Sequence, residues 1–385
     1  MSFRRSLLSL RRLGRPSLAA LLALVLLASP AHALVRFNDG RDQIFVGASY
    51  SWAYDTNIFA SSEGGSTSVS SANLHIDYAR RAGILGFNAS LSYDISRFDK
   101  FSGQNFANPS VSMELTKGEG RTTGSLTLSG ARSSRADPST NTRLNTLNYT
   151  TGLFLKYPVI DRYSFSGSFT YSQAKEVDTQ GLANLNTYSA AIDLNYVYTS
   201  ERDLMGGYRL RVTDTSFNTK SYDNSWSAGV TGKLLPKLNG SFRAGYQVRT
   251  TPGVPDSDTH GLFLTGSSSW NFDAKTSLTG QVTKDFSTTA TAVNIDSFVT
   301  SLDLQHTFNA RLSAGLNLGY GHTRFLGSLG GGRRDDYLTW GGNLNYTMRD
   351  YLKFSVTYTW FENWSTLSFS DFIRQSVTFT VSTRF

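Results

Sequence analysis

The chain has 385 residues, of which 39% are hydrophobic and 13% aromatic, and it carries a formal charge of +8. It contains no cysteine, which excludes a small domain held by disulfides and any metal site built on thiolates. Eight prolines stand beside 34 glycines, a balance that favours long regular strands over disorder.

Residues 1–33 have the layout of a cleaved signal peptide. Five arginines precede or flank the apolar run Leu18–Ala28, and Ala31-His32-Ala33 follows a Ser29-Pro30 break. That run of 11 residues is shorter than the roughly 20 that a membrane-spanning helix needs. We therefore expect cleavage after Ala33 and a mature protein of residues 34–385. Cleavage removes five arginines and no acid, so the charge falls from +8 to +3 and no longer argues for a nucleic-acid partner.

Most of the mature chain alternates apolar and polar residues with period two. In Leu312–Tyr320 and in Leu352–Trp360, every second residue is apolar and the residues between are mainly Ser, Thr, Asn or Gly. Successive side chains of a strand point to opposite faces, so each segment has one apolar and one polar face.

The connections between these segments also alternate, between eight short turns and nine longer polar loops. Seventeen connections predict eighteen strands of about 10 to 14 residues, a pattern typical of membrane barrels with short periplasmic turns and longer extracellular loops. A propeller or solenoid would need a motif in each repeat, and the sequence has none. The prediction is an all-β protein: one antiparallel transmembrane β-barrel of about 18 strands, spanning residues 34–385, in the bacterial outer membrane, with both termini periplasmic.

Aromatic residues on the apolar face gather near both ends of the strands, as in the two girdles of outer-membrane barrels. Those beside the short turns are Tyr78, Tyr157, Tyr163, Tyr198, Phe272, Phe308 and Tyr346. Those toward the long loops are Tyr50, Trp52, Tyr54, Tyr171, Trp226, Tyr246, Trp340 and Trp360.

The opposite face should line a water-filled lumen. Alternation places five cations there on three adjacent strands, namely Arg209, Arg211, Lys233, Arg243 and Arg249. The acids of the same face are expected elsewhere, at Asp77, Asp94, Glu114, Asp193 and Asp303. Such a cationic lane would attract anionic solutes or carboxylate-bearing polymers, weakly because water and salt screen it. The alternative is a generic polar lining whose charges only hydrate the pore.

Four aromatic residues also fall on the lumen face: Phe45, Phe154, Phe263 and Tyr337. They could serve as platforms for sugar rings or pack beneath an inward-folded loop. The longest connection, Asp55 to Ser68, is too short for a plug domain, so we expect a channel that is open or narrowed by loops.

No pattern predicts catalysis, so the protein should not be an enzyme. Ser71, His75 and Asp77 share one strand, but these types are common in a polar lumen and define no triad geometry. The glycine-rich segment 327–332 lies between strands and opens no helix, so it is no phosphate loop. No cluster has metal-ligand spacing, and we expect neither a metal nor any other cofactor.

The stretch Tyr54-Asp55-Thr56-Asn57-Ile58-Phe59 resembles a YDDNIF-like signature of the outer-membrane β-barrels of exopolysaccharide biosynthesis operons, the β-barrel porin 2 family. Thr56 stands where that signature has an acid. The resemblance implies an eighteen-stranded barrel that passes an exopolysaccharide across the outer membrane, with a periplasmic polysaccharide-export protein as its partner. It implies no catalytic residues.

The same motif has a local interpretation. Asp55 and Asn57 are turn formers that would start the first external loop, and Ile58 and Phe59 would anchor that loop on the barrel mouth. The alternative is an ordinary strand end with turn residues.

The last segment, Gln375–Phe385, is predicted to be the strand that closes the barrel, with Val377, Phe379, Val381 and Phe385 facing lipid. By resemblance, the terminal Phe385 is an expected signal for the barrel assembly machinery. The other expected contacts are outer-membrane lipid and lipopolysaccharide.

Three functions remain open. The first is polysaccharide export, with the polymer as the transported ligand. The second is a diffusion porin for small solutes, anionic ones among them, although no long constriction loop is evident. The third is a structural or adhesive surface barrel, against which the short loops count.

Overall fold

The computed structural model describes residues 35–80, 83–177, 181–253, 258–327 and 331–385. Within these ranges the chain forms a short strand, β1 (Val35–Phe37), eighteen long strands and two 3-10 turns, η1 (Ser102–Gln104) and η3 (Ser368–Ser370). The long strands are β2 (Asp42–Asp55), β3 (Thr67–Arg80), β4 (Leu85–Phe98), β5 (Phe106–Lys117), β6 (Thr123–Asp137), β7 (Thr142–Ile160), β8 (Tyr163–Glu176), β9 (Leu185–Thr199), β10 (Arg202–Thr215), β11 (Lys220–Leu235), β12 (Leu238–Thr250), β13 (Thr259–Asn271), β14 (Thr276–Thr288), β15 (Asn294–Thr307), β16 (Leu312–Phe325), β17 (Arg334–Arg349), β18 (Leu352–Ser365) and β19 (Phe372–Arg384).

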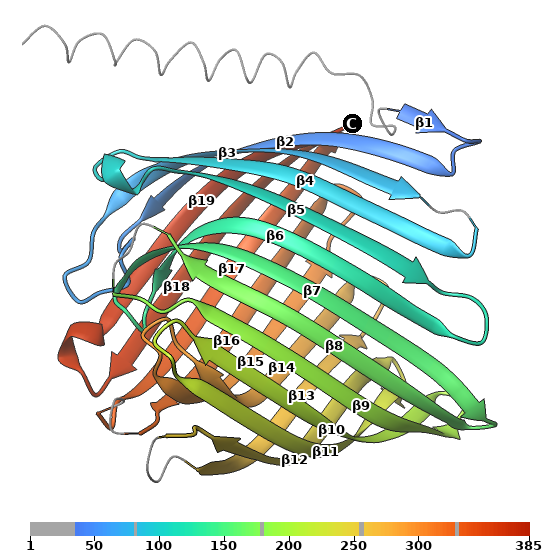
Figure 1. Cartoon of the computed structure of the whole chain (residues 1–385). Coiled ribbons are helices and arrows are strands. Elements are labelled where there is room, and N and C mark those ends of the chain that lie inside the picture. The colour runs from blue at the N-terminus through green and yellow to red at the C-terminus, as the bar shows by residue number, and fades with distance from the viewer. Residues whose placement is uncertain (1–34, 81–82, 178–180, 254–257, 328–330) are drawn as a thin grey trace, which may run out of the picture.

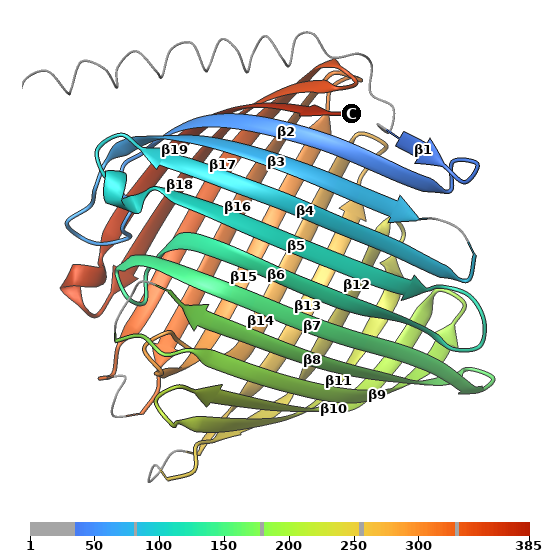
Figure 2. The ribbon, with the colours of Figure 1, turned by 45° about the horizontal axis from the view of Figure 1, so that its top comes forward.

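The eighteen long strands form a closed antiparallel barrel, as predicted (Figure 1, Figure 2). Each strand pairs with its neighbours in the chain, and β19 closes the barrel on β2 from Ser376 opposite Asp55 to Arg384 opposite Gly47. Closure leaves no free sheet edge, which is the condition for crossing a bilayer with strands. The predicted signal peptide, residues 1–33, lies outside the described residues. In the described ranges, none of the helical segments has the length and hydropathy to cross a membrane.

The nine longer loops lie at one end of the barrel and the eight short turns at the other (Figure 1). The first long strand begins and the last strand ends at the end with the short turns. Several strands exceed the predicted length, and β7 has 19 residues. The longest strands project beyond the rim, so strand length alone does not mark the membrane boundary.

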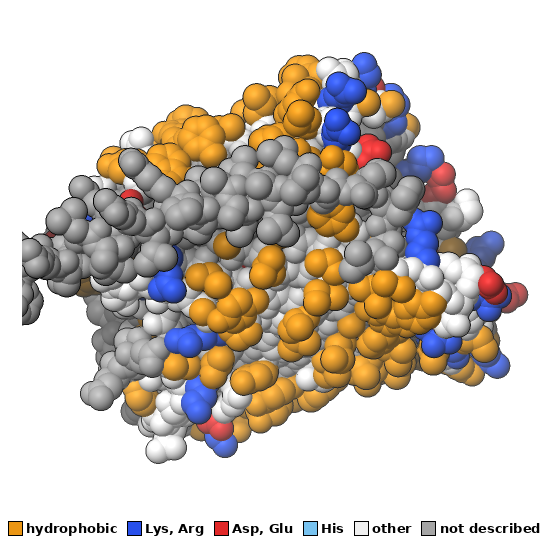
Figure 3. Space-filling model, turned by 90° about the horizontal axis from the view of Figure 1, so that it is seen from above, with side chains coloured by type: hydrophobic (Ala, Val, Ile, Leu, Met, Phe, Trp, Pro, Cys, Tyr) orange, Lys and Arg blue, Asp and Glu red, His pale blue; other side chains and the backbone are white. Residues whose placement is uncertain are grey.

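The outer wall is apolar (Figure 3). Leu74, Leu91, Ile192 and Leu316 are each more than half exposed, which in a soluble protein would be unusual over so wide an area. Residues of both predicted aromatic girdles stand on this face, among them Trp52, Tyr54, Trp226, Tyr246, Trp340, Tyr157, Tyr163, Tyr198, Phe308 and Tyr346. The wall therefore matches a hydrocarbon layer bounded by two interfaces.

Backbone pairing of the closing strand continues to Phe385. Its N–H donates to the carbonyl oxygen of Val46 at 2.8 Å, and the N–H of Val46 donates back at 2.8 Å. The Phe385 ring stacks on Tyr351, with centroids 5.9 Å apart. The barrel seam is therefore paired up to this residue, whereas its role as an assembly signal stays a prediction.

Candidate functional site in the barrel lumen

The tip of the β6–β7 hairpin, residues 136–143, folds inward over the lumen, and we call it the mouth hairpin. Its turn begins at Asp137, whose carboxylate accepts a hydrogen bond from the Ser139 N–H at 2.8 Å. The Asn141 N–H donates to the Asp137 carbonyl at 2.8 Å, and Asn141 has φ of 52°. Asn tolerates that left-handed conformation better than most residues, so the sequence suits this tight turn.

Contacts from three other loops hold the mouth hairpin in place. The Asn141 amide donates to the Ala60 carbonyl at 2.8 Å and accepts from the Ser370 hydroxyl at 2.7 Å. Arg333, in the β16–β17 loop, donates to the carbonyls of Pro138 and Ser139, each at 2.9 Å. Since β16–β17 lies far around the barrel from β6–β7, the hairpin crosses the mouth.

The underside of the mouth hairpin packs on the inner wall. The Arg143 guanidinium lies 4.9 Å from the ring centroid of Phe98 and 5.9 Å from that of Phe106, and it donates to the Ile58 carbonyl at 3.3 Å. Ile58 is 1% exposed and Leu144 is 2% exposed. Of the two expected forms, an open channel or one narrowed by loops, the structure has the second, although no long constriction loop was evident in the sequence. A short loop suffices, because the strands that carry it bend inward as well.

The motif Tyr54–Phe59 forms the other half of this mouth packing. The Asn57 N–H donates to the Asp55 carboxylate at 2.9 Å, and the Asn57 amide donates to the Ser61 carbonyl at 2.7 Å. The same Asp55 carboxylate pairs with Arg374 of β19 at 2.6 Å across the barrel seam. The Phe59 ring meets Phe101 edge-on, with centroids 5.1 Å apart. These contacts hold the start of the first loop against the barrel mouth, while Tyr54 stays on the outer face.

Three of the predicted lumen cations belong to one ion-pair network, which we call the arginine cluster: Arg209, Arg211, Arg249, Asp223 and Asp285. Arg249 donates to both oxygens of Asp223, at 2.6 and 2.8 Å, and Arg211 donates to Asp223 at 2.7 Å. Arg209 and Arg211 both reach Asp285, at 2.9 Å. The side chains of Asp223 and Arg249 are 0% and 1% exposed. Each of the three arginines is paired with a carboxylate and none stands free as a lane, although three cations against two acids leave the cluster a net charge of +1.

The arginine cluster also sets the shape of the lumen. Arg209 is on β10 and Asp285 is on β14, strands that would lie about 19 Å apart in a flat sheet. Their direct contact requires the wall from β10 to β14 to curve sharply. At the rim the same two sectors meet again, where the Ala183 N–H donates to the Ala290 carbonyl at 2.7 Å.

The remaining two cations of the predicted lane are paired as well. Arg243 donates to both carboxylate oxygens of Asp193, at 3.2 Å for the Nη1–Oδ2 contact. Lys233 pairs with Glu201 at 2.7 Å at the end with the short turns, where both side chains are largely exposed. The expectation that the lumen acids lie apart from the cations is therefore wrong for Asp193. Alternation gives the face of a residue but not its neighbour across the lumen, and Asp223 and Asp285 were missed for the same reason.

The four predicted lumen aromatics face inward but do not form one path. Phe263 is buried under Arg209, whose guanidinium lies 4.5 Å from the ring centroid. Phe45 lies under Arg384 at 4.4 Å. Phe154 is 42% exposed in the lumen. Tyr337 lies apart from these three, beside the mouth.

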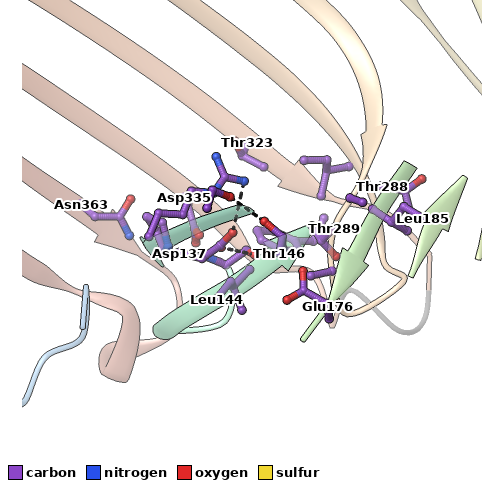
Figure 4. Close-up of a pocket in the computed structure, with 18 of the residues that line it drawn as sticks. Asp137, Leu144, Thr146, Glu176, Leu185, Thr288, Thr289, Thr323, Asp335 and Asn363 are labelled. Atoms are coloured by element: carbon purple, nitrogen blue, oxygen red, sulfur yellow. Dashed lines mark hydrogen bonds and ion pairs between the residues drawn. The ribbon is translucent and has the colours of Figure 1, made fainter. Parts of the chain in front are cut away.

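A cavity of about 750 Å³ lies beside the mouth hairpin, and we call it the lumen cavity (Figure 4). One wall comes from β6 to β9 and the other from β14 to β18. Its lining mixes hydroxyl-bearing and amide side chains with apolar ones such as Leu144, Leu185, Ile295 and Phe325, and includes four charged side chains: Arg135, Asp137, Glu176 and Asp335. A second cavity of about 380 Å³ lies on the other side of the hairpin, against β17 to β19. The hairpin therefore divides the mouth.

Stacked aromatic rings line the boundary between the two cavities. Tyr337 stacks on Phe361 with centroids 5.3 Å apart, and Phe361 stacks on Phe372 at 5.5 Å. Tyr337 lies flat on the wall because its cross-strand partner is Gly321. A Cβ at Gly321 would come within 2.1 Å of the Tyr337 ring, so glycine is required for this packing.

The residues considered for catalysis are not assembled into a site. His75 Nδ1 contacts Asn73 Oδ1 at 3.1 Å, whereas the Asp77 carboxylate accepts from Ser90 at 2.9 Å. Among the residues that the structure describes, no group of three or more His, Cys, Asp or Glu side chains is placed to hold a metal ion.

A closed eighteen-stranded barrel with an apolar wall, two aromatic girdles and a polar lumen defines an outer-membrane β-barrel of the porin type. Residues 208–385, just under half of the chain, match the sequence model of the family described as "Putative beta-barrel porin 2". The description of that family names a porin and no enzyme, in agreement with the prediction.

Solved structures resemble the chain in fold at low sequence identity. The crystal structure of Pseudomonas aeruginosa OccK2 (OpdF) in complex with glucuronate is 11% identical, covers 89% of this chain and 98% of its own, and has a TM-score of 0.50. Acinetobacter baumannii OccAB4 is 14% identical with the same coverage and a TM-score of 0.46. At these identities the likeness concerns the fold alone. Among curated proteins, none matches the chain significantly.

Proposed function

We infer that the protein is an outer-membrane diffusion channel for small hydrophilic solutes. The observation that carries this inference is the mouth hairpin, which crosses the opening and leaves beside it a cavity of about 750 Å³ whose lining includes charged and hydroxyl-bearing side chains. Cavities of about 300 to 1,000 Å³ are typical of small-molecule sites. The porin description of the family matched by residues 208–385 supports the same inference.

Polymer export is the second candidate, supported by the resemblance of Tyr54–Phe59 to barrels of exopolysaccharide operons. A polymer would need a wider opening, so the mouth hairpin would have to leave the lumen. That movement would break the contacts of Asn141 and Arg143 with the β2–β3 and β18–β19 loops, and those that Arg333 of the β16–β17 loop makes with the hairpin. We therefore rank export below diffusion, and a periplasmic polysaccharide-export partner belongs to this second candidate only.

Conductance of the purified protein in a planar lipid bilayer tests the proposal. A diffusion channel gives steady, ohmic current without any partner protein. The polymer candidate is tested by deleting the gene and measuring extracellular polysaccharide. Silent bilayers together with lost polysaccharide secretion would reverse our ranking, whereas steady current with normal secretion supports it.

A further inference from the structure

One carboxyl group in the lumen cavity lacks the partners that the other two acids of the cavity have. Glu176, the last residue of β8, has its Oε2 atom buried, and no described residue donates a hydrogen bond to it. Its backbone N–H donates to the Asn184 side chain at 2.9 Å, which fixes the backbone and leaves the carboxyl free. Buried polar groups are usually hydrogen-bonded, so an exception needs an explanation.

The two other acids of the cavity are satisfied. Asp137 accepts from Ser139 and lies 4.0 Å from Arg135. Asp335 pairs with Arg333 at 2.6 Å and accepts from the Ser365 hydroxyl at 2.6 Å. Counting Arg135 and Arg333 against the three acids leaves one net negative charge, and Glu176 is the acid without a cation of its own.

The walls around Glu176 suit a positively charged guest. The Tyr337 and Phe361 rings line the cavity; Phe361 is stacked between Tyr337 and Phe372, so Tyr337 is the ring whose face could attract an organic cation within about 6 Å. Thr146, which pairs with Glu176 across β7 and β8, and Asn148 supply hydroxyl and amide groups on the same wall. Among the described lining residues the one cation is Arg135, which lies 4.0 Å from Asp137 with a largely exposed side chain, and Arg211 at the neighbouring opening is bound to Asp223 and Asp285.

We propose that the lumen cavity is a selectivity site for small organic cations, in which the Glu176 carboxylate receives the positive charge of the solute. This inference rests on the proposed channel function and specifies its substrate class. The proposed selectivity is for cations, whereas the predicted lane would select anions. The difference arises because the arginines of the lane are already paired, while the cavity holds the unpaired acid.

The site should depend on pH near neutrality. Burial raises the pKa of Glu176 from 4.5 to about 7, with the negative charge of Asp137 acting in the same direction and Arg135 opposing both. Glu176 lies at the rim, five residues beyond Tyr171 of the outer girdle, outside the membrane-spanning part of β8. Above pH 7 the ionised form predominates and attracts cations, and below it the cavity is close to neutral.

The test uses choline, a permanent cation, on the full-length protein in detergent and in planar bilayers. We expect choline to bind by calorimetry at pH 8.5, and Glu176→Gln to weaken binding by up to about fivefold, the factor that corresponds to about 1 kcal/mol. The same substitution should lower the potassium-over-chloride permeability ratio at pH 8.5 and change it little at pH 5.5. Glu114→Gln, which removes a lumen carboxyl on β5 outside the cavity, is the matched control for binding and should leave choline affinity unchanged.

Thr146→Lys provides a second variant, because it places an ammonium group opposite Glu176 and should abolish choline binding. Tighter binding of glucuronate than of choline, or equal choline binding by wild type and E176Q, would overturn the selectivity site. If bilayers show no current but choline binds and E176Q weakens it, the site stands and the channel function fails. If wild type gives steady current but E176Q changes neither selectivity nor choline binding, the channel function stands and the selectivity site fails.

Discussion

Arg333 holds Ser139 across the mouth of the barrel: its Nη1 lies 2.9 Å from the Ser139 carbonyl oxygen, although 194 residues separate the two. Its Nη2 makes a second bond of 2.9 Å to the Pro138 carbonyl. The guanidinium itself is fixed by Asp335 and lies 4.4 Å from the ring centroid of Phe325. This contact joins two loops from distant sectors and keeps the mouth hairpin inside the lumen.

Arg333→Ala should widen the channel. It removes two hydrogen bonds from a charged donor, each worth roughly 1.5 to 3 kcal/mol, so the hairpin should sample positions outside the lumen. We expect a larger single-channel conductance with more frequent fluctuations between current levels. Arg334→Ala is the control, because this neighbouring side chain is exposed. Equal conductance of R333A and wild type would show that the contact does not hold the hairpin.

Asp223→Ala should strongly destabilise the barrel. It leaves Arg211 and Arg249 without their shared carboxylate, and removing one partner of a buried ion pair costs about 3 to 5 kcal/mol. The measurement is the urea midpoint of unfolding in detergent. Glu201→Gln, which breaks the exposed pair with Lys233, should cost no more than about 1 kcal/mol. A similar midpoint for both variants would mean that the arginine cluster is not a structural brace.

Arg243→Gln should make the channel more cation-selective. The substitution frees the Asp193 carboxylate, which now pairs with Arg243 inside the lumen, and a ring or wall of acid favours cations. Reversal potentials in a potassium chloride gradient measure the change, and high salt should reduce it by screening. A free cationic lane would also become less anion-selective when Arg243 is removed, so this variant alone does not separate a free lane from paired arginines. The selectivity of the wild-type channel does: a strong anion preference would favour the free lane.

Stability should fall as pH rises through the range set by Glu176. The pKa of this carboxyl is about 7 in the folded protein, above its ordinary value of 4.5, so the folded state holds the proton more tightly than the unfolded chain. The contribution is complete below pH 4.5 and is lost as pH rises to about 7. The difference in the free energy of unfolding between Glu176→Gln and wild type should therefore be more favourable to the variant at pH 8 than at pH 4.5. A constant difference between the two proteins over this range would contradict the shifted pKa.

The sequence was sufficient to predict the barrel because its signal is periodic. Alternation in segments such as Leu312–Tyr320, together with eight turns and nine loops, determined strand number, face and closure. These features depend on residues close together in the chain and on the contrast between lipid outside the barrel and water inside it.

The lumen contacts were not predictable in this way. Arg209 and Asp285 are 76 residues apart, and only the curvature of the wall brings them together. The mouth hairpin was missed because its loop is short and the inward bend belongs to the strands. One signal was available: Asp137-Pro138-Ser139 and Asn141 form a tight polar turn next to Leu144, an apolar residue on the lumen face.

Single-channel recording of the purified protein, with Arg333→Ala and Arg334→Ala recorded in parallel, tests the central claim most directly. The account predicts steady ohmic current from wild type and R334A without any partner, and a larger, noisier current from R333A. Silent bilayers for all three proteins, each shown to be folded by its heat-dependent migration in gels, would contradict it.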